Sequence, residues 1–83
     1  MNKVKVNVIM ANCVEIRTSE GVSLQSYNSI IAYTSNRGET TLDETYYDYS
    51  KATGRHRNYF LNETLKETRA KIKSGVYKLA DLN

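Results

Sequence analysis

The chain has 83 residues, with twelve Lys and Arg against nine Asp and Glu, which gives a formal net charge of +3. Hydrophobic residues make up 40% of it, enough for one thin core but not for a two-domain enzyme or a full dinucleotide-binding sheet. We therefore expect one compact domain over residues 1–83.

A first strand is indicated at the beginning of the chain. Val4, Val6 and Val8 alternate with Lys5 and Asn7, and this period of two is typical of a half-buried strand. The same polar residues interrupt the apolar run before it reaches the length of a signal-peptide core.

The next strands form a predicted hairpin. Val14 and Ile16 alternate with charged residues, and Val22 and Leu24 alternate with polar ones. Between them lies a Ser-Glu-Gly turn in which Gly21 is expected to adopt a positive φ.

An apolar run follows over Ser29–Thr34, and it predicts a central strand covered on both faces. The turn signal Ser35–Gly38 leads into Glu39–Leu42, a short polar strand expected at an edge, where it could pair with a second copy to form a homodimer. The first half of the chain thus predicts an antiparallel meander of four to five strands.

Two short helices are predicted next. Ser50 is a suitable N-cap for a helix over Lys51–Leu61, although Gly54 costs this helix about 1 kcal/mol relative to Ala. A partial apolar stripe on it includes Ala52, Tyr59 and Phe60.

The second helix has clearer signals. Thr64 and Glu67 match a capping box, and Gly75 matches the residue that ends a helix in the left-handed conformation. Val76–Leu82 then forms a short strand or a docked tail. The predicted fold class is α+β: an antiparallel meander of four to five strands, two short helices and a short C-terminal strand.

Charge is distributed unevenly along the chain. Residues 1–48 hold four basic and six acidic side chains, whereas residues 49–83 hold eight basic and three acidic ones. This asymmetry can orient an encounter with a charged partner, and it is equally compatible with ordinary solvated surfaces.

The sequence offers little for catalysis. Cys13 is the only cysteine and His56 the only histidine, so a disulfide within the chain and a Cys- or His-rich metal site are excluded. The two residues could in principle act as a nucleophile and its base, but the sequence offers no third group to orient them. The acidic side chains of Asp43, Glu44 and Asp48 do not match a calcium-binding loop. We expect no cofactor, no metal and no enzymatic activity. A single cysteine suits a reducing cytosol, so we expect a cytoplasmic protein in the host cell. No apolar run approaches about 18 residues, the length of a membrane span, so we expect no membrane partner.

The segment from Tyr46 to Tyr59 has the composition of a contact surface. Tyrosine combines a large flat ring with a polar tip, and arginine makes planar contacts to carboxylates and phosphates. The alternative is that Tyr47, Tyr49 and Phe60 form the core beneath the first helix while the charges are solvated. The predicted partner-binding residues are Tyr46, Tyr47, Tyr49, Lys51, Arg55, His56, Arg57 and Tyr59.

Nucleic acid is a second possible target. Cations on one surface would contact a phosphate backbone, and interleaved aromatic rings would suit base stacking. The residues of this alternative are Lys51, Arg55, Arg57, Lys71 and Lys73.

Three stretches resemble a known group of proteins. They are S-Y-N-S-I-I-A-Y at Ser26–Tyr33, Y-D-Y-S at Tyr47–Ser50, and K-I-K-S-G-V-Y-K-L-A-D-L-N at Lys71–Asn83. Over Val4–Asn83 the chain resembles small uncharacterised proteins of phages and mobile elements of low-GC Gram-positive bacteria, with Tyr47 where Trp is expected.

The resemblance implies a setting and no site residues. It suggests a non-enzymatic phage accessory protein that binds and inhibits a host or defence complex, as anti-CRISPR proteins do. The alternative is a small nucleic-acid-binding accessory or regulatory protein.

Overall fold

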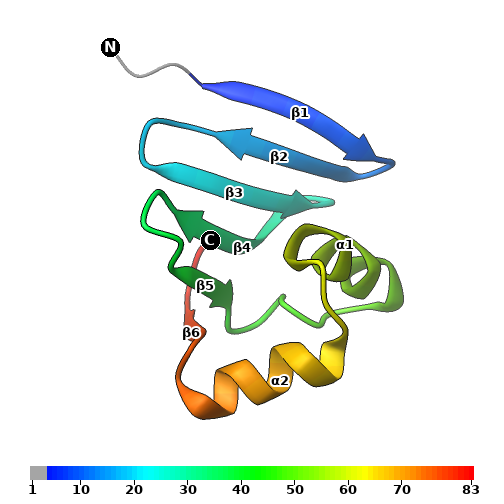
Figure 1. Ribbon diagram of the computed structural model, residues 1–83. Coiled ribbons are helices and arrows are strands. Elements are labelled where there is room, and N and C mark those ends of the chain that lie inside the picture. The colour runs from blue at the N-terminus through cyan, green and yellow to red at the C-terminus, as the bar shows by residue number, and fades with distance from the viewer. Residues whose placement is uncertain (1–3) are drawn as a thin grey trace.

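The computed structural model describes residues 4–83 and contains one six-stranded sheet with two helices on one of its sides (Figure 1). The elements in chain order are β1 (Lys5–Met10), β2 (Cys13–Arg17), β3 (Gly21–Ser26), β4 (Ser29–Ser35), β5 (Thr40–Asp43), α1 (Lys51–Leu61), α2 (Leu65–Ser74) and β6 (Lys78–Ala80).

Strands β1 to β5 form an antiparallel meander in chain order, and β6 joins the sheet parallel to β5. The α+β class and the order of strands, helices and C-terminal strand are therefore confirmed. The prediction that Glu39–Leu42 lies at an edge is wrong, because β5 pairs with β4 on one side and with β6 on the other. In residues 4–83 the edges are β1 and β6.

Two glycines in turn regions have different roles. Gly38 adopts φ +84° within the turn that the sequence predicts. Gly21 is the first residue of β3 and has no positive φ, so that prediction is wrong. A Cβ on Gly21 would lie 2.8 Å from the Tyr33 hydroxyl oxygen and closer still to the carbonyl oxygen of Thr34. Glycine is required there because strand β4 approaches closely, not because the backbone is left-handed.

A β-bulge in β1 decides which side its valines face. The register moves from Val8 paired with Val14 to Met10 paired with Cys13, so Ile9 is an extra residue. Met10 consequently faces the helices, whereas Val6 and Val8 face the opposite side and are 64% and 72% exposed. The expected half-buried strand at the N-terminus thus buries its valines less than the alternation suggests.

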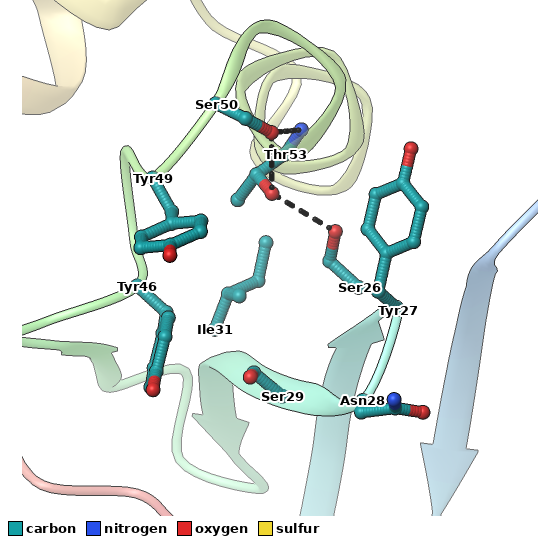
Figure 2. Close-up of a pocket in the computed structure, with 9 residues that line it drawn as sticks. All are labelled: Ser26, Tyr27, Asn28, Ser29, Ile31, Tyr46, Tyr49, Ser50 and Thr53. Atoms are coloured by element: carbon teal, nitrogen blue, oxygen red, sulfur yellow. Dashed lines mark hydrogen bonds between the residues drawn. The ribbon is translucent and has the colours of Figure 1, made fainter.

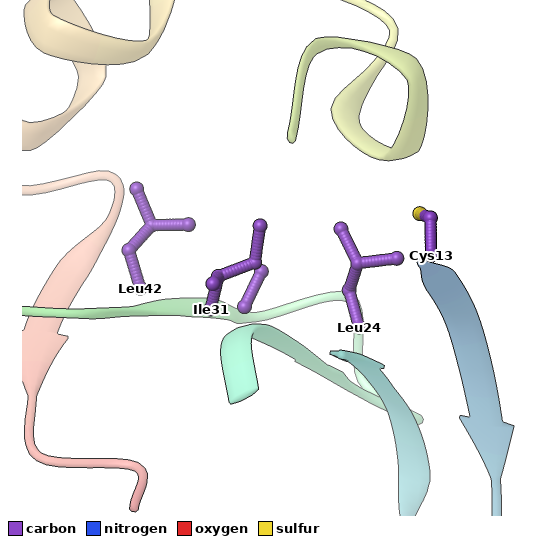
Figure 3. Packing of buried hydrophobic residues seen from close by; sticks show 5 residues of the cluster. Cys13, Leu24, Ile31 and Leu42 are labelled. Carbon is purple, nitrogen blue, oxygen red and sulfur yellow. The ribbon is translucent and has the colours of Figure 1, made fainter. Parts of the chain in front are cut away.

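A second bulge lies between β3 and β4. Leu24 pairs with Ala32 and Gln25 pairs with Ile30, which leaves Ile31 as the extra residue. As a result, the adjacent side chains of Ile31 and Ala32 are both buried. The buried hydrophobic residues of the described chain are Cys13, Leu24, Ile31, Ala32 and Leu42. In Figure 3 the labelled side chains of this cluster point toward the helices. Strand β4 is central, as predicted, but helices cover only one of its faces.

Both helices begin and end at the predicted residues. The Ser50 hydroxyl accepts a hydrogen bond from the Thr53 amide at 3.1 Å, and Thr64 and Glu67 form the full capping box. Gly75 ends α2 with φ +86°. No helix in residues 4–83 is long and apolar enough to cross a membrane.

The end of the chain docks on the sheet beside β4 and β5. The Asn83 side chain donates a hydrogen bond to the backbone carbonyl oxygen of Ile30 at 2.9 Å, and it accepts one from the backbone amide of Ile30 at 2.8 Å. Asp43 accepts hydrogen bonds from the Leu82 amide at 2.7 Å and from Asn83 at 3.0 Å. The expected short strand and docked tail are both present, and they enclose Asp43.

Candidate contact surface

The structure separates the eight predicted partner-binding residues by exposure. Tyr46 and Tyr47 are half-buried, and His56 and Arg57 are buried. The exposed members are Tyr49, Lys51, Arg55 and Tyr59. Three of these, at positions 51, 55 and 59, are spaced four residues apart on α1, so they form one exposed stripe along the helix.

Arg57 is a structural residue with only 1% of its surface exposed. Its Nη1 donates to the Tyr47 carbonyl at 2.7 Å and to Asp48 Oδ1 at 3.1 Å, and its Nη2 donates to Asn58 Oδ1 at 3.0 Å. Arg57 lies inward while Arg55 lies outward because residues two apart on a helix face nearly opposite sides. It therefore stabilises the segment that enters α1 and is not free to contact a partner.

His56 is also buried, and its Nδ1 lies 2.7 Å from the Ser26 hydroxyl oxygen. A chain of hydroxyls continues from Ser26 to Thr53 at 3.3 Å and to Ser50 at 3.1 Å (Figure 2). Burial lowers the pKa of His56 and the nearby charge of Arg55 lowers it further, against a hydrogen bond to the Ala11 backbone that raises it. The ring is therefore neutral near neutral pH. Its hydrogen bond with Ser26 holds α1 against the end of β3.

A hollow of about 390 Å³, which we call the aromatic cleft, opens beside this hydroxyl chain (Figure 2). Its lining residues are Ser26, Tyr27, Asn28, Ser29, Ile31, Tyr46, Tyr49, Ser50 and Thr53. The rings of Tyr46 and Tyr49 pack against each other with their centroids 5.2 Å apart. Tyr27 lies across the hollow from them and is 49% exposed.

Tyr27 was not among the residues predicted from sequence. It occupies the turn between β3 and β4 with φ +55°, a conformation that is uncommon for a bulky residue. The sequence does contain a signal for its exposure: Tyr27 is a tyrosine in a polar turn between two predicted strands, where a large side chain has no core to enter.

A second hollow of about 410 Å³, which we call the cationic groove, lies on the other side of the first turn of α1. Its lining residues are Asp48, Ser50, Lys51, Gly54, Arg55, Arg57, Asn58 and Leu65. Ser50 lines both hollows, so the N-cap of α1 stands between them. Within residues 4–83, Arg57 Nε is a buried donor without a hydrogen-bond partner.

The five cations of the nucleic-acid alternative do not form one free surface. Arg57 is buried, and Lys71 Nζ donates to Glu63 Oε1 at 2.6 Å. That hydrogen bond raises the pKa of Lys71. Lys73 is exposed on α2. Among these five cations, Lys51 and Arg55 are the exposed ones that share both a helix and the cationic groove.

The acidic segment after β5 is mostly occupied by contacts within the chain. Burial alone would raise the pKa of Asp43, but hydrogen bonds from the Leu82 and Tyr46 backbones and from Asn83 lower it. Asp48 pairs with Arg57 and, at 3.2 Å, with Arg69. These two carboxylates hold loops in place.

Cys13 is almost completely buried. Burial raises the pKa of its thiol, and the neighbouring carboxylate of Glu15 raises it further. The thiol is therefore protonated near neutral pH and a poor nucleophile. The closest partner of His56 Nδ1 is Ser26, not this cysteine.

Comparison with known proteins identifies a family. Residues 2–75 match the model of a protein family described as "Family of unknown function (DUF8033)". No curated protein and no solved structure matches the chain. The match covers most of the sequence and includes both hollows, but it specifies neither a source nor an activity.

Proposed function

The chain belongs to the DUF8033 family, whose function is unknown, and we propose that this chain is a non-enzymatic binding protein. Its contact surface surrounds the first turn of α1 and comprises the aromatic cleft, the cationic groove and the exposed stripe of Lys51, Arg55 and Tyr59.

The observation that carries this proposal is the position of Ser50, which lines two hollows of opposite character. Tyr27 and Tyr49 flank an aromatic hollow on one side, and Lys51 and Arg55 flank a groove on the other. Tyrosine and arginine around a pocket are the residues that most often dominate binding energy at protein interfaces. Such a cleft accepts an inserted side chain, and the adjacent cations add charge selectivity.

The partner that fits is a protein that inserts an apolar or aromatic side chain into the aromatic cleft. Acidic groups of the same partner would lie next to Lys51 and Arg55. The resemblance to phage-encoded proteins extends the proposal: the partner is a host or defence complex, and binding inhibits it in the manner of an anti-CRISPR protein.

The test is affinity capture on the immobilised full chain from a lysate of a low-GC Gram-positive bacterium, the setting that the resemblance implies. The variants Tyr49→Ser and Arg55→Ala change exposed side chains on either side of Ser50. Arg37→Ala, in the turn between β4 and β5, is the matched control because Arg37 is also exposed. We expect one partner to be retained by the wild type and by Arg37→Ala, and to be lost or reduced at least about tenfold by the other two.

Equal retention by all four proteins would contradict a contact surface at α1. Activity of the captured complex, measured with and without added protein, then tests inhibition separately from binding.

Nucleic-acid binding is the second candidate, and the position of the exposed Lys51 and Arg55 along one groove favours it. A phosphate group in this groove would accept charge-assisted hydrogen bonds from both side chains. Fluorescence anisotropy with labelled single-stranded and duplex DNA tests this candidate. Binding that weakens steeply with salt and is lost in Arg55→Glu but kept in Arg37→Glu would support it, and no binding at low salt would eliminate it.

A further inference from the structure

The side of the sheet that faces away from the helices carries a compact apolar patch on its first two strands. Val6 pairs with Ile16 and Val8 pairs with Val14, so the four side chains form a block on one face. Since Glu15 pairs with the buried Leu24, this block lies on the face opposite the core. We call these four residues the valine patch.

The valine patch is uncharged, and its two residues on β1 are exposed, whereas Val14 and Ile16 on β2 are half-buried. Val6 and Val8 are 64% and 72% exposed, and Val4, which precedes β1, is 61% exposed. In the described strands β1, β2 and β3, the other residues facing this side are Gly21, Ser23 and Gln25, so none of them is charged. Clusters of exposed apolar side chains on small proteins commonly mark interaction sites.

We propose that the valine patch is the interface of a homodimer, in which the same face of a second copy packs against it. An interface around a two-fold axis must be self-complementary, and an uncharged apolar face satisfies this condition without like-charge contacts. Strands β1 and β2 therefore favour a copy of this chain over a charged partner.

The size of the face is consistent with a reversible dimer. The valine patch lies on β1 and β2, and together with β3 and β4 these strands form a face of roughly 20 by 20 Å. Two such faces bury roughly 800 Å², the size of a weak or transient interface. The dimer should accordingly form and dissociate over the micromolar range.

This interface leaves the proposed contact surface free. The aromatic cleft and the cationic groove adjoin α1, on the helix-bearing side of the sheet, while the valine patch faces away from it. A dimer would carry two contact surfaces on its outer sides, so a partner with repeated sites would be bound more tightly by avidity. The dimer proposal does not depend on the proposed function.

The experiment compares two substitutions at neighbouring positions of β1. Val8→Lys places a charge within the valine patch, and Asn7→Lys adds the same charge to the opposite face of the same strand. Light scattering over a concentration series measures the mass, and circular dichroism checks the fold. For the wild type we expect the mass to rise from 9.5 kDa toward twice that value. Asn7→Lys should behave in the same way, and Val8→Lys should stay monomeric.

Two results would overturn the proposal. One is a wild-type protein that remains a 9.5 kDa monomer up to millimolar concentration. The other is equal dissociation by Asn7→Lys and Val8→Lys, because this would place the contact at the edge of β1 and not on its face. If Val8→Lys fails to fold, Val8→Thr removes apolar area with little change of shape and should raise the dissociation constant several-fold.

Discussion

On the helix-bearing side of the sheet Leu24 and Leu42 are fully buried, whereas on the other side Val6 and Val8 expose more than half of their surface. All four are aliphatic residues within strands, and three of them lie in runs that alternate with polar residues. The difference arises from the bulge at Ile9 and from the position of the helices, which cover only one face. Alternation thus identifies a strand with an apolar face, but not whether that face meets the core, a partner or solvent.

The largest expected effect contrasts the two sides directly. Leu24→Ala should lower the free energy of unfolding by about 2–5 kcal/mol, because it leaves a cavity in the small core. Val8→Thr should change it by less than about 0.5 kcal/mol at protein concentrations where the chain is monomeric. Urea denaturation of both variants measures the difference. A loss of unfolding free energy of similar size in Val8→Thr would mean that the valine patch is packed in the monomer.

Arg57 and Arg55 make a second contrast, within α1. Arg57→Ala should cost about 2–4 kcal/mol, because it removes the hydrogen bonds to Tyr47 and Asp48 and leaves their oxygens partly unpaired. Arg55→Ala should cost less than about 0.5 kcal/mol because its side chain is exposed. Thermal unfolding checks both values. Equal costs would contradict the structural role of Arg57.

Two glycines should respond to alanine in opposite directions. Gly21→Ala should destabilise the chain by about 1–3 kcal/mol, because the Cβ of the new alanine would collide with β4. Gly54→Ala should stabilise α1 by up to about 1 kcal/mol, because the nearest atom to its Cβ, Arg57 Nη2, would lie at an ordinary 3.5 Å. Melting temperatures of the two variants decide the sign at each position.

The smallest expected effect is a pH dependence confined to the helix-bearing side. The pKa of His56 is lowered below its ordinary value of 6.5 in the folded chain, so the unfolded chain binds the proton more readily. Stability from this group is present above pH 6.5 and is lost as the pH falls below that value. His56→Asn should flatten the unfolding free energy between pH 6.5 and the lower range where carboxylates titrate. An unchanged slope would assign the dependence to other groups.

The local features of the fold were predictable because nearby residues determine them. Ser50 and Thr64 cap helices through their own side chains, and Gly38 and Gly75 adopt positive φ where the chain turns or a helix ends. These interactions span a few residues, so the spacing of residue types is sufficient to locate them. The helix limits and the strand order of the meander follow from such signals.

The proposed contact surface was only partly predictable from the sequence. Tyr49, Lys51, Arg55 and Tyr59 are exposed, but the prediction grouped them with His56 and Arg57, which α1 turns inward. Tyr27 joins the aromatic cleft from a turn about twenty residues earlier in the chain. Composition along a segment cannot reveal which helix face is covered, nor which distant turn lies next to it.

What the sequence alone determined about this protein is therefore its set of elements: four to five strands in a meander, two capped helices and a C-terminal segment. The tertiary structure decided which apolar residues form the core, that β6 covers β5 and makes β1 the free edge of the meander, and that Ser50 separates two hollows. The physical reason is that a bulge of one residue reverses the side a strand presents. Such reversals depend on pairing between strands, which no pattern within one strand records.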